Sequence, residues 1–273
     1  MKIYYSFLVL LGASLVAGFP TKPINETDEE LPIRAHVVGG TKVDQGEMPF
    51  AVSVNIRGSQ GGAFCTGFLI TESIALTAAH CVENWQQVSI KYGDVALNNQ
   101  KQIAAKNVVI HEKYQSSRKN YLHDIAIIFL KEKIVTGPNA KPITIDTINP
   151  QPNQLVISAG WGATSDPGGG LSSQLLKVNQ NIADAETCKK YDENFTGFDG
   201  PDFCVFPVRG KSICYGDSGG PLLSGVKGKY KLLGITSHWS RTGRYCADGT
   251  MFPYFTHVSY YLDWLKSKGV PLK

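Results

Sequence analysis

The stretch Gly216-Asp217-Ser218-Gly219-Gly220-Pro221 sets a serine among glycines just before an apolar run. Far upstream, one apolar run ends in Thr77-Ala78-Ala79-His80-Cys81, and another opens with His123-Asp124-Ile125-Ala126-Ile127-Ile128. Each stretch alone has an ordinary explanation, since a glycine-rich serine loop can be a tight turn and an Asp at a strand start often caps one. Together they offer a nucleophile, a base and an orienting carboxylate, which are the groups that an activated serine needs.

Short apolar or alternating runs surround these motifs and are separated by glycine-rich or proline-rich clusters, which are typical of hairpin loops. The runs cover residues 50–56, 67–70, 74–77, 88–92, 106–110, 125–130, 155–159, 221–223 and 232–237. Their spacing favours an all-β barrel or sandwich. Only residues 258–266 differ, because Val258, Tyr261 and Leu265 recur at helical spacing and predict a C-terminal amphipathic helix.

The N-terminal residues indicate where the protein goes. Residues 1–18 have the pattern of a secretory signal peptide, with an apolar stretch shorter than the roughly 20 residues that cross a membrane. Residues 19–36 carry prolines and an acidic run, and we expect them to form a polar activation propeptide. The remaining residues, 37–273, are the expected folded body of a secreted, extracellular protein.

Composition excludes several classes of protein. With 42% hydrophobic residues the chain is too apolar to be disordered, and its net charge of +4 comes from scattered Lys and Arg, which does not indicate a nucleic-acid site. Six cysteines in an oxidising compartment predict three disulfides, with their pairing open at this point. Zinc is disfavoured because the sequence contains no CxxC pair. Two sequons make Asn25 and Asn194 glycosylation candidates.

The three motifs, in the order His80, Asp124, Ser218, closely resemble those of the chymotrypsin-like (trypsin-fold) serine proteases over essentially residues 37–268. The resemblance implies two six-stranded antiparallel Greek-key β-barrels with a C-terminal α-helix and an active site between the barrels. It also implies an acyl-enzyme mechanism in which Ser218 attacks a peptide carbonyl, His80 moves the proton and Asp124 orients His80. The backbone N–H groups of Gly216 and Ser218 would form the oxyanion hole.

The same resemblance assigns the cysteines and the cofactors. It pairs Cys65 with Cys81, Cys188 with Cys204 and Cys214 with Cys246, a set of three bridges that is similar to invertebrate members of the family. It implies no cofactor and no metal, because the calcium loop of some relatives would need a second carboxylate near residues 98–101, where none is present.

Activation is where the sequence departs from the family pattern. Family members are usually made as zymogens, and the new ammonium group at the start of the processed chain pairs with the Asp before the catalytic Ser. Val37 and Asp217 match these two positions, but His36 precedes Val37 in place of Arg or Lys. We expect cleavage after His36, either directly or by trimming after a first cut at Arg34.

The residues that correspond to the substrate pocket indicate a neutral site. Ser212, with Ile213 beside it, stands where an Asp would select Arg or Lys, so we expect an apolar residue before the scissile bond. Ser237, His238 and Trp239 match the strand that pairs with substrate, and Pro253 lies on the opposite wall. If Trp239 takes the position of the usual Gly, it crowds the pocket mouth; if an insertion shifts the frame, it is the ordinary wall. Chymotrypsin-like and elastase-like specificity both remain open.

The predicted partners are protein or peptide substrates, an activating protease and protein protease inhibitors, with the chain acting as a monomer and binding neither nucleic acid nor membrane. A catalytically impaired member that acts as a binding or regulatory protein is the alternative, since His36, His238 and Trp239 depart from the family pattern. The intact triad favours the endopeptidase. His123 is a competing base, and we expect it to point away from the site because neighbouring strand residues face opposite sides.

Overall fold

The computed structural model describes residues 38–58, 61–116, 121–165, 169–240, 245–246 and 248–272, all of which belong to one compact unit. The predictions for residues 1–18, residues 19–36, Val37 and Asn25 lie outside these ranges. Within the described ranges, no helix combines the length and apolar character that a membrane crossing requires.

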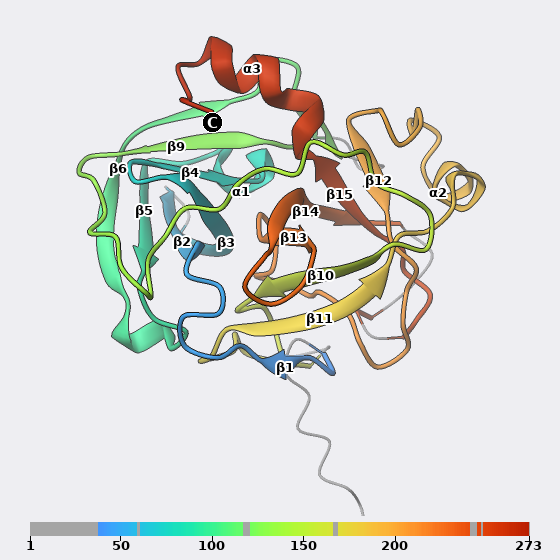
Figure 1. Ribbon diagram of the computed structural model, residues 1–273, viewed down its shortest axis with the longest axis horizontal. Helices are drawn as coiled ribbons and strands as arrows, with labels where there is room; N and C mark the ends of the chain where they lie inside the picture. The colour runs from blue at the N-terminus through green and yellow to red at the C-terminus, as the bar shows by residue number, and fades with distance from the viewer. Residues whose placement is uncertain are drawn as a thin grey trace, which may run out of the picture. The chain divides into compact units, whose positions relative to one another are not determined.

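The first half of the chain forms a closed barrel of six strands in the order β2-β3-β4-β9-β6-β5 (Figure 1). Its neighbouring strands pair antiparallel, and their bounds are β2 Ala51–Gly58, β3 Gly61–Thr71, β4 Ile74–Thr77, β5 Gln87–Tyr92, β6 Lys101–Ile110 and β9 Ala126–Leu130. Strand β5 shows why: Val88, Ile90 and Tyr92 are buried and alternate with more exposed polar residues. This period of two places one apolar face of each strand inside the barrel.

The second half forms a seven-stranded antiparallel sheet in the order β1-β11-β10-β13-β14-β15-β12. The bounds are β1 Thr41–Lys42, β10 Leu155–Gly160, β11 Leu176–Asn181, β12 Asp202–Cys204, β13 Pro221–Ser224, β14 Lys231–Trp239 and β15 Pro253–His257. An antiparallel bridge between Ile182 and Val205 joins the ends of β11 and β12, and Ala183 N–H donates to Cys204 O beside it at 3.0 Å. This bridge curls the sheet towards a second barrel, and with the closed first barrel the fold agrees with the expected two-barrel architecture.

Three strands of the second barrel were not predicted from the residue pattern. Strand β11 has the sequence LKVNQN, in which polar residues hide the alternation of buried positions, and β12 has only three residues. Strand β15 begins at Pro253 and is followed directly by helix, so its apolar residues merge with those of the helical stretch. These strands depend on partners that are distant in sequence rather than on their own pattern.

Few helices accompany the barrels. They are α1 Ala79–Val82, the 3-10 turn η1 Leu97–Asn99, α2 Ala185–Tyr191, the 3-10 turn η2 Val258–Tyr261 and α3 Leu262–Ser267. The last two confirm the C-terminal helix, and Val258, Tyr261 and Leu265 are its buried residues. A short hairpin, β7 Gln115–Ser116 with β8 Tyr121–Leu122, lies just before Asp124.

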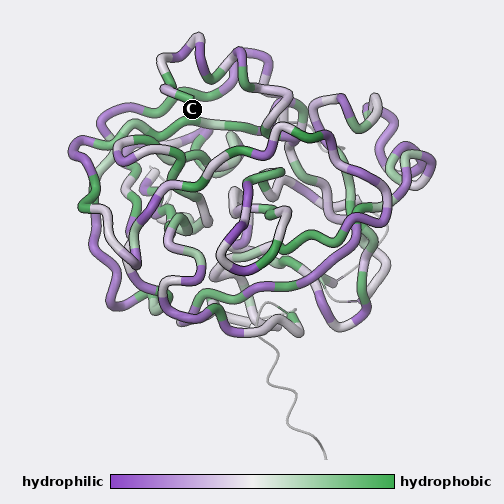
Figure 2. Tube along the Cα trace, viewed as in Figure 1, coloured by the Kyte–Doolittle hydropathy of each residue, from purple (hydrophilic) through white to green (hydrophobic). Residues whose placement is uncertain are grey.

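Hydrophobic residues concentrate along the strands, whereas hydrophilic residues dominate the peripheral loops (Figure 2). The fully buried side chains include Phe68, Leu76 and Ile127 in the first barrel and Phe203 and Phe255 in the second. These cores hold the strand ends that carry the motifs: His80 follows β4, Asp124 precedes β9 and Ser218 precedes β13.

Candidate active site

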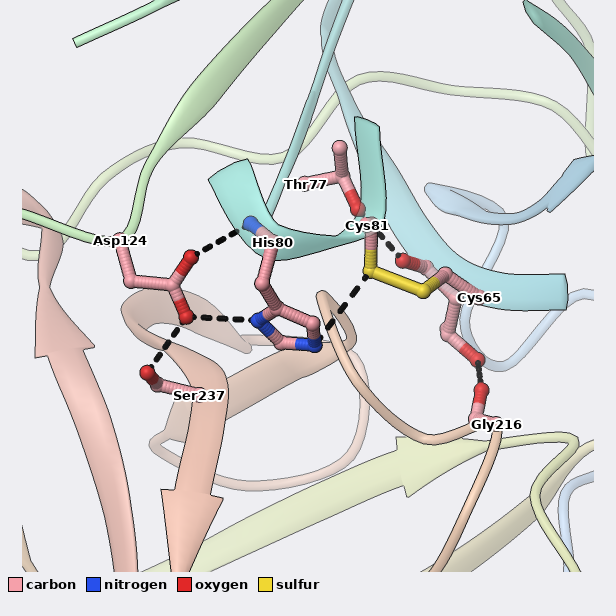
Figure 3. Close-up of a disulfide and its surroundings, with 8 residues drawn as sticks. Cys65, Thr77, His80, Cys81, Asp124, Gly216 and Ser237 are labelled. Atoms are coloured by element: carbon pink, nitrogen blue, oxygen red, sulfur yellow. Dashed lines mark hydrogen bonds and ion pairs between the residues drawn. A yellow bond between two sulfur atoms is a disulfide. The ribbon is translucent and has the colours of Figure 1, made fainter. Parts of the chain in front are cut away.

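His80 and Asp124 are joined at two points, although 44 residues separate them in the chain (Figure 3). The ring Nδ1 of His80 lies 2.8 Å from Asp124 Oδ2, and the backbone N–H of His80 donates to Asp124 Oδ1 at 2.9 Å. Strands β4 and β9 pair from Ile74 to Thr77, so their ends bring α1 and the Asp124 turn together. This double contact fixes the orientation of the imidazole relative to the carboxylate.

Asp124 is held from the second barrel as well. Ser237 Oγ on β14 donates to Asp124 Oδ2 at 2.6 Å, and Thr256 Oγ1 on β15 donates to the Asp124 carbonyl at 2.9 Å. The carboxyl group, only 1% exposed, therefore lies between elements of both barrels. The three hydrogen-bonding contacts of the carboxyl group compensate for much of the cost of removing its charge from water.

The electrostatics of the pair suit a base. Burial alone would raise the pKa of Asp124, but His80 and the hydrogen bond from Ser237 outweigh burial and lower it. Burial alone would also lower the pKa of His80, but Asp124 outweighs it, so the pKa is raised above its ordinary value of 6.5. Asp124 thus stays ionised and accepts from Nδ1–H, which leaves the lone pair of the neutral ring at Nε2.

The loop that carries Ser218 is pressed against the segment that carries His80. Thr66 N–H donates to Ser218 O at 2.9 Å, and Gly219 N–H donates to Thr236 O at 2.8 Å. Gly219 has φ of +77°, and a Cβ there would collide with Thr77 Oγ1 and come within 3.0 Å of the Ala78 nitrogen. The loop therefore lies so close to the end of β4 that only glycine fits at position 219.

Ser218 itself is half-buried, and no hydrogen bond joins its Oγ to His80 among the described residues. Unliganded catalytic hydrogen bonds are often long and tighten only with substrate. The N–H groups of Gly216 and Ser218 donate to no other described atom, although both lie in a tightly bonded loop. Thr66 Oγ1 meanwhile donates a hydrogen bond to the carbonyl of Gly216 at 2.9 Å. Two backbone donors thus remain available to an oxyanion.

Asp217 is a second buried carboxylate, 1% exposed. Its Oδ1 accepts from Gly162 N–H and its Oδ2 from Cys214 N–H, both at 2.8 Å. Burial outweighs these two hydrogen bonds and raises the pKa of Asp217 to about 7. Among the described residues no cation pairs with Asp217. Without such a partner, the charged form of this buried carboxyl is unfavourable. Its expected partner, the amino group of Val37, lies outside the described residues.

The residues expected to form the pocket lie on β14, at the start of β15 and in the segment that precedes Ser218. Ser212, Ile213, Ser237, His238 and Pro253 are buried, while Trp239 is half-buried. Trp239 and Pro253 pair across β14 and β15. The Trp239 ring meets the Tyr215 ring at 5.8 Å in an edge-to-face contact. Part of the following loop, residues 241–244 and Ala247, lies outside the described residues, so both interpretations of Trp239 stay open.

The three disulfides link the pairs that the resemblance implies: Cys65 with Cys81, Cys188 with Cys204 and Cys214 with Cys246. The first joins β3 to the helix that carries His80, and the third begins two residues before Gly216. Among the described residues, Cys65, His80 and Cys81 have ligand atoms close enough to one another to hold a metal ion. They do not fit one, because both sulfurs are bonded to each other and neither is a thiolate.

The whole sequence and fold have known relatives. A model of the trypsin family matches residues 37–265. The chain belongs to the trypsin family. It is therefore a chymotrypsin-like serine endopeptidase, a hydrolase. Trypsin Blo t 3 of Blomia tropicalis is 32% identical over 285 residues, which cover 100% of both chains. Trypsin-1 of Astacus astacus is 32% identical over 246 residues, covering 86% of this chain and 100% of that one.

A solved structure supports the same fold. Neuropsin, a serine protease expressed in the limbic system of mouse brain, matches with a TM-score of 0.72 and 25% identity, covering 84% of this chain and 98% of that one. His123, the competing base, makes its contacts elsewhere. Its Nδ1 is 3.0 Å from Tyr261 Oη and its ring stacks on His111. It therefore contacts the C-terminal helix region and not Ser218.

Sequence reasoning missed several residues that support this trypsin-family site. Thr66 bonds both ends of the Ser218 loop, through its N–H and its Oγ1. Gly160 and Gly162 are needed because a Cβ on either would collide with the Asp217 carboxylate. Ser237 was expected in the substrate pocket but also supports Asp124. The Gly-Trp-Gly pattern at residues 160–162 was a signal of close approach, whereas Thr66 carries no local signal at all.

Proposed function

We propose that His80, Asp124 and Ser218 form the catalytic triad of this protease and cleave peptide bonds through an acyl-enzyme. The observation that carries this proposal is the two-point contact between His80 and Asp124, beside a serine loop that packs on the same segment. Ser218 Oγ attacks the carbonyl while His80 Nε2 accepts its proton and later returns it to the leaving amine. The free N–H groups of Gly216 and Ser218 stabilise the oxyanion.

A serine-directed phosphonyl probe tests this assignment. The processed protein is treated with the probe and the adduct is located by peptide mapping, with Ser218→Ala as the matched control. We expect a single adduct on Ser218 that the control lacks. A processed protein that carries no adduct on Ser218 would contradict the triad and favour the binding or regulatory alternative.

The protease is proposed to be a secreted zymogen. Its three disulfides suit an oxidising compartment. Asp217 is buried beside Ser218 and would be neutralised by the ammonium group of a new N-terminus at Val37. Cutting after Arg34 alone would leave two extra residues, so His36 must also be removed. N-terminal sequencing of active protein should start at Val37, and full activity with a start at Ala35 would refute this step.

The substrate preference is proposed to be an apolar residue before the scissile bond. Ser212 offers a neutral hydroxyl in a buried position, so it cannot compensate for the desolvation of an Arg or Lys side chain. A peptide library digested with the active protease, followed by mass spectrometry of the products, measures this directly. Cleavage mainly after Arg or Lys would contradict the proposal.

The remaining partners and modifications are proposals of the same kind. The protein would act as a monomer on proteins or peptides and be controlled by an activating protease and protein inhibitors. Asn194 is half-buried and its Nδ2 donates to Asp192 Oδ1 at 3.2 Å. A glycan on this amide would leave one N–H for that contact. Intact-mass measurement before and after deglycosylation checks whether the site is used.

A further inference from the structure

The ring of His238 on β14 is buried between two oxygen atoms. Its Nδ1 lies 3.1 Å from Ser237 Oγ, and its Nε2 lies 3.7 Å from Asp192 Oδ2. The ring is only 8% exposed and stacks on the ring of Tyr254 with 5.0 Å between centroids and 10° between planes. The oxygen at Nδ1 is within hydrogen-bond distance, whereas the oxygen at Nε2 is too far away for a hydrogen bond.

The direction of these hydrogen bonds follows from Asp124. Its carboxyl group has a lowered pKa and is therefore ionised, so it carries no hydrogen to donate. Ser237 Oγ lies 2.6 Å from Asp124 Oδ2, and at that distance the hydroxyl must donate its one hydrogen to the carboxylate. The same hydroxyl oxygen can then only accept from His238. Hence Nδ1 of His238 carries a hydrogen and donates it to Ser237.

We propose that His238 is a positioning residue for the catalytic pair: its Nδ1–H gives the Ser237 oxygen a second hydrogen bond, which holds this side chain in the position from which it donates to Asp124. The chain of contacts then runs from Asp192 through His238 and Ser237 to Asp124 and His80. An apolar aromatic ring in the same place would pack on Tyr254 but would remove the second hydrogen bond, so the Ser237 hydroxyl would be held by Asp124 alone. This inference rests on the proposed catalytic roles of His80 and Asp124.

Asp192, at the far end of this series of contacts, is held by several hydrogen bonds. Asp192 directly follows α2, and its Oδ1 accepts from the backbone N–H of Asn194 at 2.9 Å and from Asn194 Nδ2 at 3.2 Å. Its backbone N–H donates to Cys188 O at 2.9 Å, and Cys188 is tied to Cys204 on β12. The Asp192 carboxylate is therefore held in place 3.7 Å from Nε2, beyond hydrogen-bond distance.

Titratable groups surround this ring on every side. They are Asp192 after α2, Tyr254 on β15, Tyr121 on β8 and, through Ser237, Asp124; beyond Asp192 lies Asp202 on β12. Burial and the nearby Asp192 raise the pKa of Asp202 to about 7, so this group takes up a proton close to neutral pH. Comparisons of variants should accordingly be made at one fixed pH above 8, where the state of Asp202 does not vary.

Two substitutions separate positioning from packing. His238→Phe keeps an aromatic ring for Tyr254 but removes the donor, and we expect kcat to fall roughly 3- to 10-fold with KM little changed. His238→Asn loses the ring but can place an amide N–H near the position of Nδ1, so it should recover most of kcat. His238→Gln is the matched control, because its amide reaches towards Asp192 and should behave like Phe. Simple packing predicts the opposite order, with Phe best, and that order would overturn the proposal.

A double-mutant cycle with Ser237→Ala provides the second test. If His238 acts through Ser237, His238→Phe should have no further effect on kcat once Ser237 is alanine. Fully additive losses would overturn the proposal. Phosphonyl labelling of Ser218 counts the folded, competent sites in each preparation, so kcat is expressed per labelled site and misfolded protein does not contribute. Wild-type protein that neither labels nor cleaves would overturn the proposed function; an active, labelled wild type with an unchanged His238→Phe variant would overturn this inference alone.

Discussion

Replacing Asp217 by Asn should stabilise the uncut precursor and destabilise the processed protease. In the precursor, Val37 is in a peptide bond and offers no ammonium group to this buried carboxyl. Its partners among the described residues are the N–H groups of Gly162 and Cys214, which do not offset burial, so its pKa rises from 3.8 to about 7. After processing, a cation becomes available and the sign of the effect should reverse.

The magnitude follows from linkage. At about 1.4 kcal/mol per pKa unit, the change from 3.8 to about 7 corresponds to a cost of about 4 kcal/mol. Between these two values the folded precursor binds more protons than the unfolded chain, so its stability falls as pH rises through this window. The cost is fully present above pH 7 and absent below 3.8. Asn carries no charge and so removes this ionisation cost. Its single amide oxygen cannot accept from the N–H groups of both Gly162 and Cys214, and the lost hydrogen bond costs about 1–3 kcal/mol. The net gain at pH 8 should be about 1–3 kcal/mol.

Urea unfolding measures both forms. Each carries Ser218→Ala to prevent self-digestion, and the processed form is made with a cleavable leader that leaves Val37 at its N-terminus. At pH 8 we expect Asp217→Asn to raise the unfolding free energy of the precursor and to lower that of the processed form by about 3–5 kcal/mol. A precursor that loses stability on this substitution, or whose stability does not change between pH 4 and pH 7, would refute the reasoning.

Three other substitutions test the site and the core. Asp124→Asn removes the group that raises the pKa of His80, so the acid limb of the kcat/KM profile should move to lower pH while kcat falls about 10⁴-fold; an unmoved limb would contradict this. Gly219→Ala places a Cβ against Thr77 Oγ1 at φ of +77° and should displace the serine loop. We expect kcat, calculated per active site counted by burst titration, to fall about 100-fold or more. Full activity would show that the loop can adjust. Leu76→Ala, at a position with 0% exposure in the first barrel, should cost about 2–5 kcal/mol by thermal or urea unfolding, and a cost below 1 kcal/mol would mean that the barrel collapses around the cavity.

The sequence predicts the parts of this fold that repeat a local pattern. The run at residues 74–77 is strand β4 in the structure, and the helical spacing of Val258, Tyr261 and Leu265 does form the C-terminal helix. Strand β11 was missed because the polar Gln180 takes one of its three buried positions, which leaves only Leu176 and Val178 as apolar residues facing the core. Its strand conformation comes from pairing with β10 along its whole length, which no local window of sequence records.

The candidate site divides in the same way. The motifs around His80, Asp124 and Ser218 indicate the type of chemistry, because nucleophile, base and carboxylate are recognisable from residue type and order. The hydrogen bond from Ser237 to Asp124 spans 113 residues and joins the two barrels, so it exists only once both have formed.

The sequence by itself therefore determined the reacting groups, the even set of cysteines and the all-β class, since these depend on residue identity and short-range pattern. Tertiary structure decided how the groups are held: Thr66 on the serine loop, two glycines against Asp217, and His238 behind Ser237. At the level of sequence, His238 was only a departure from the family pattern. In the fold, its ring stacks on Tyr254 of the paired strand, with Nδ1 against Ser237 Oγ and Nε2 facing Asp192, which is distant in sequence. Hydrogen bonds need atoms within about 3 Å, and only the folded chain sets such distances between residues that are far apart in sequence.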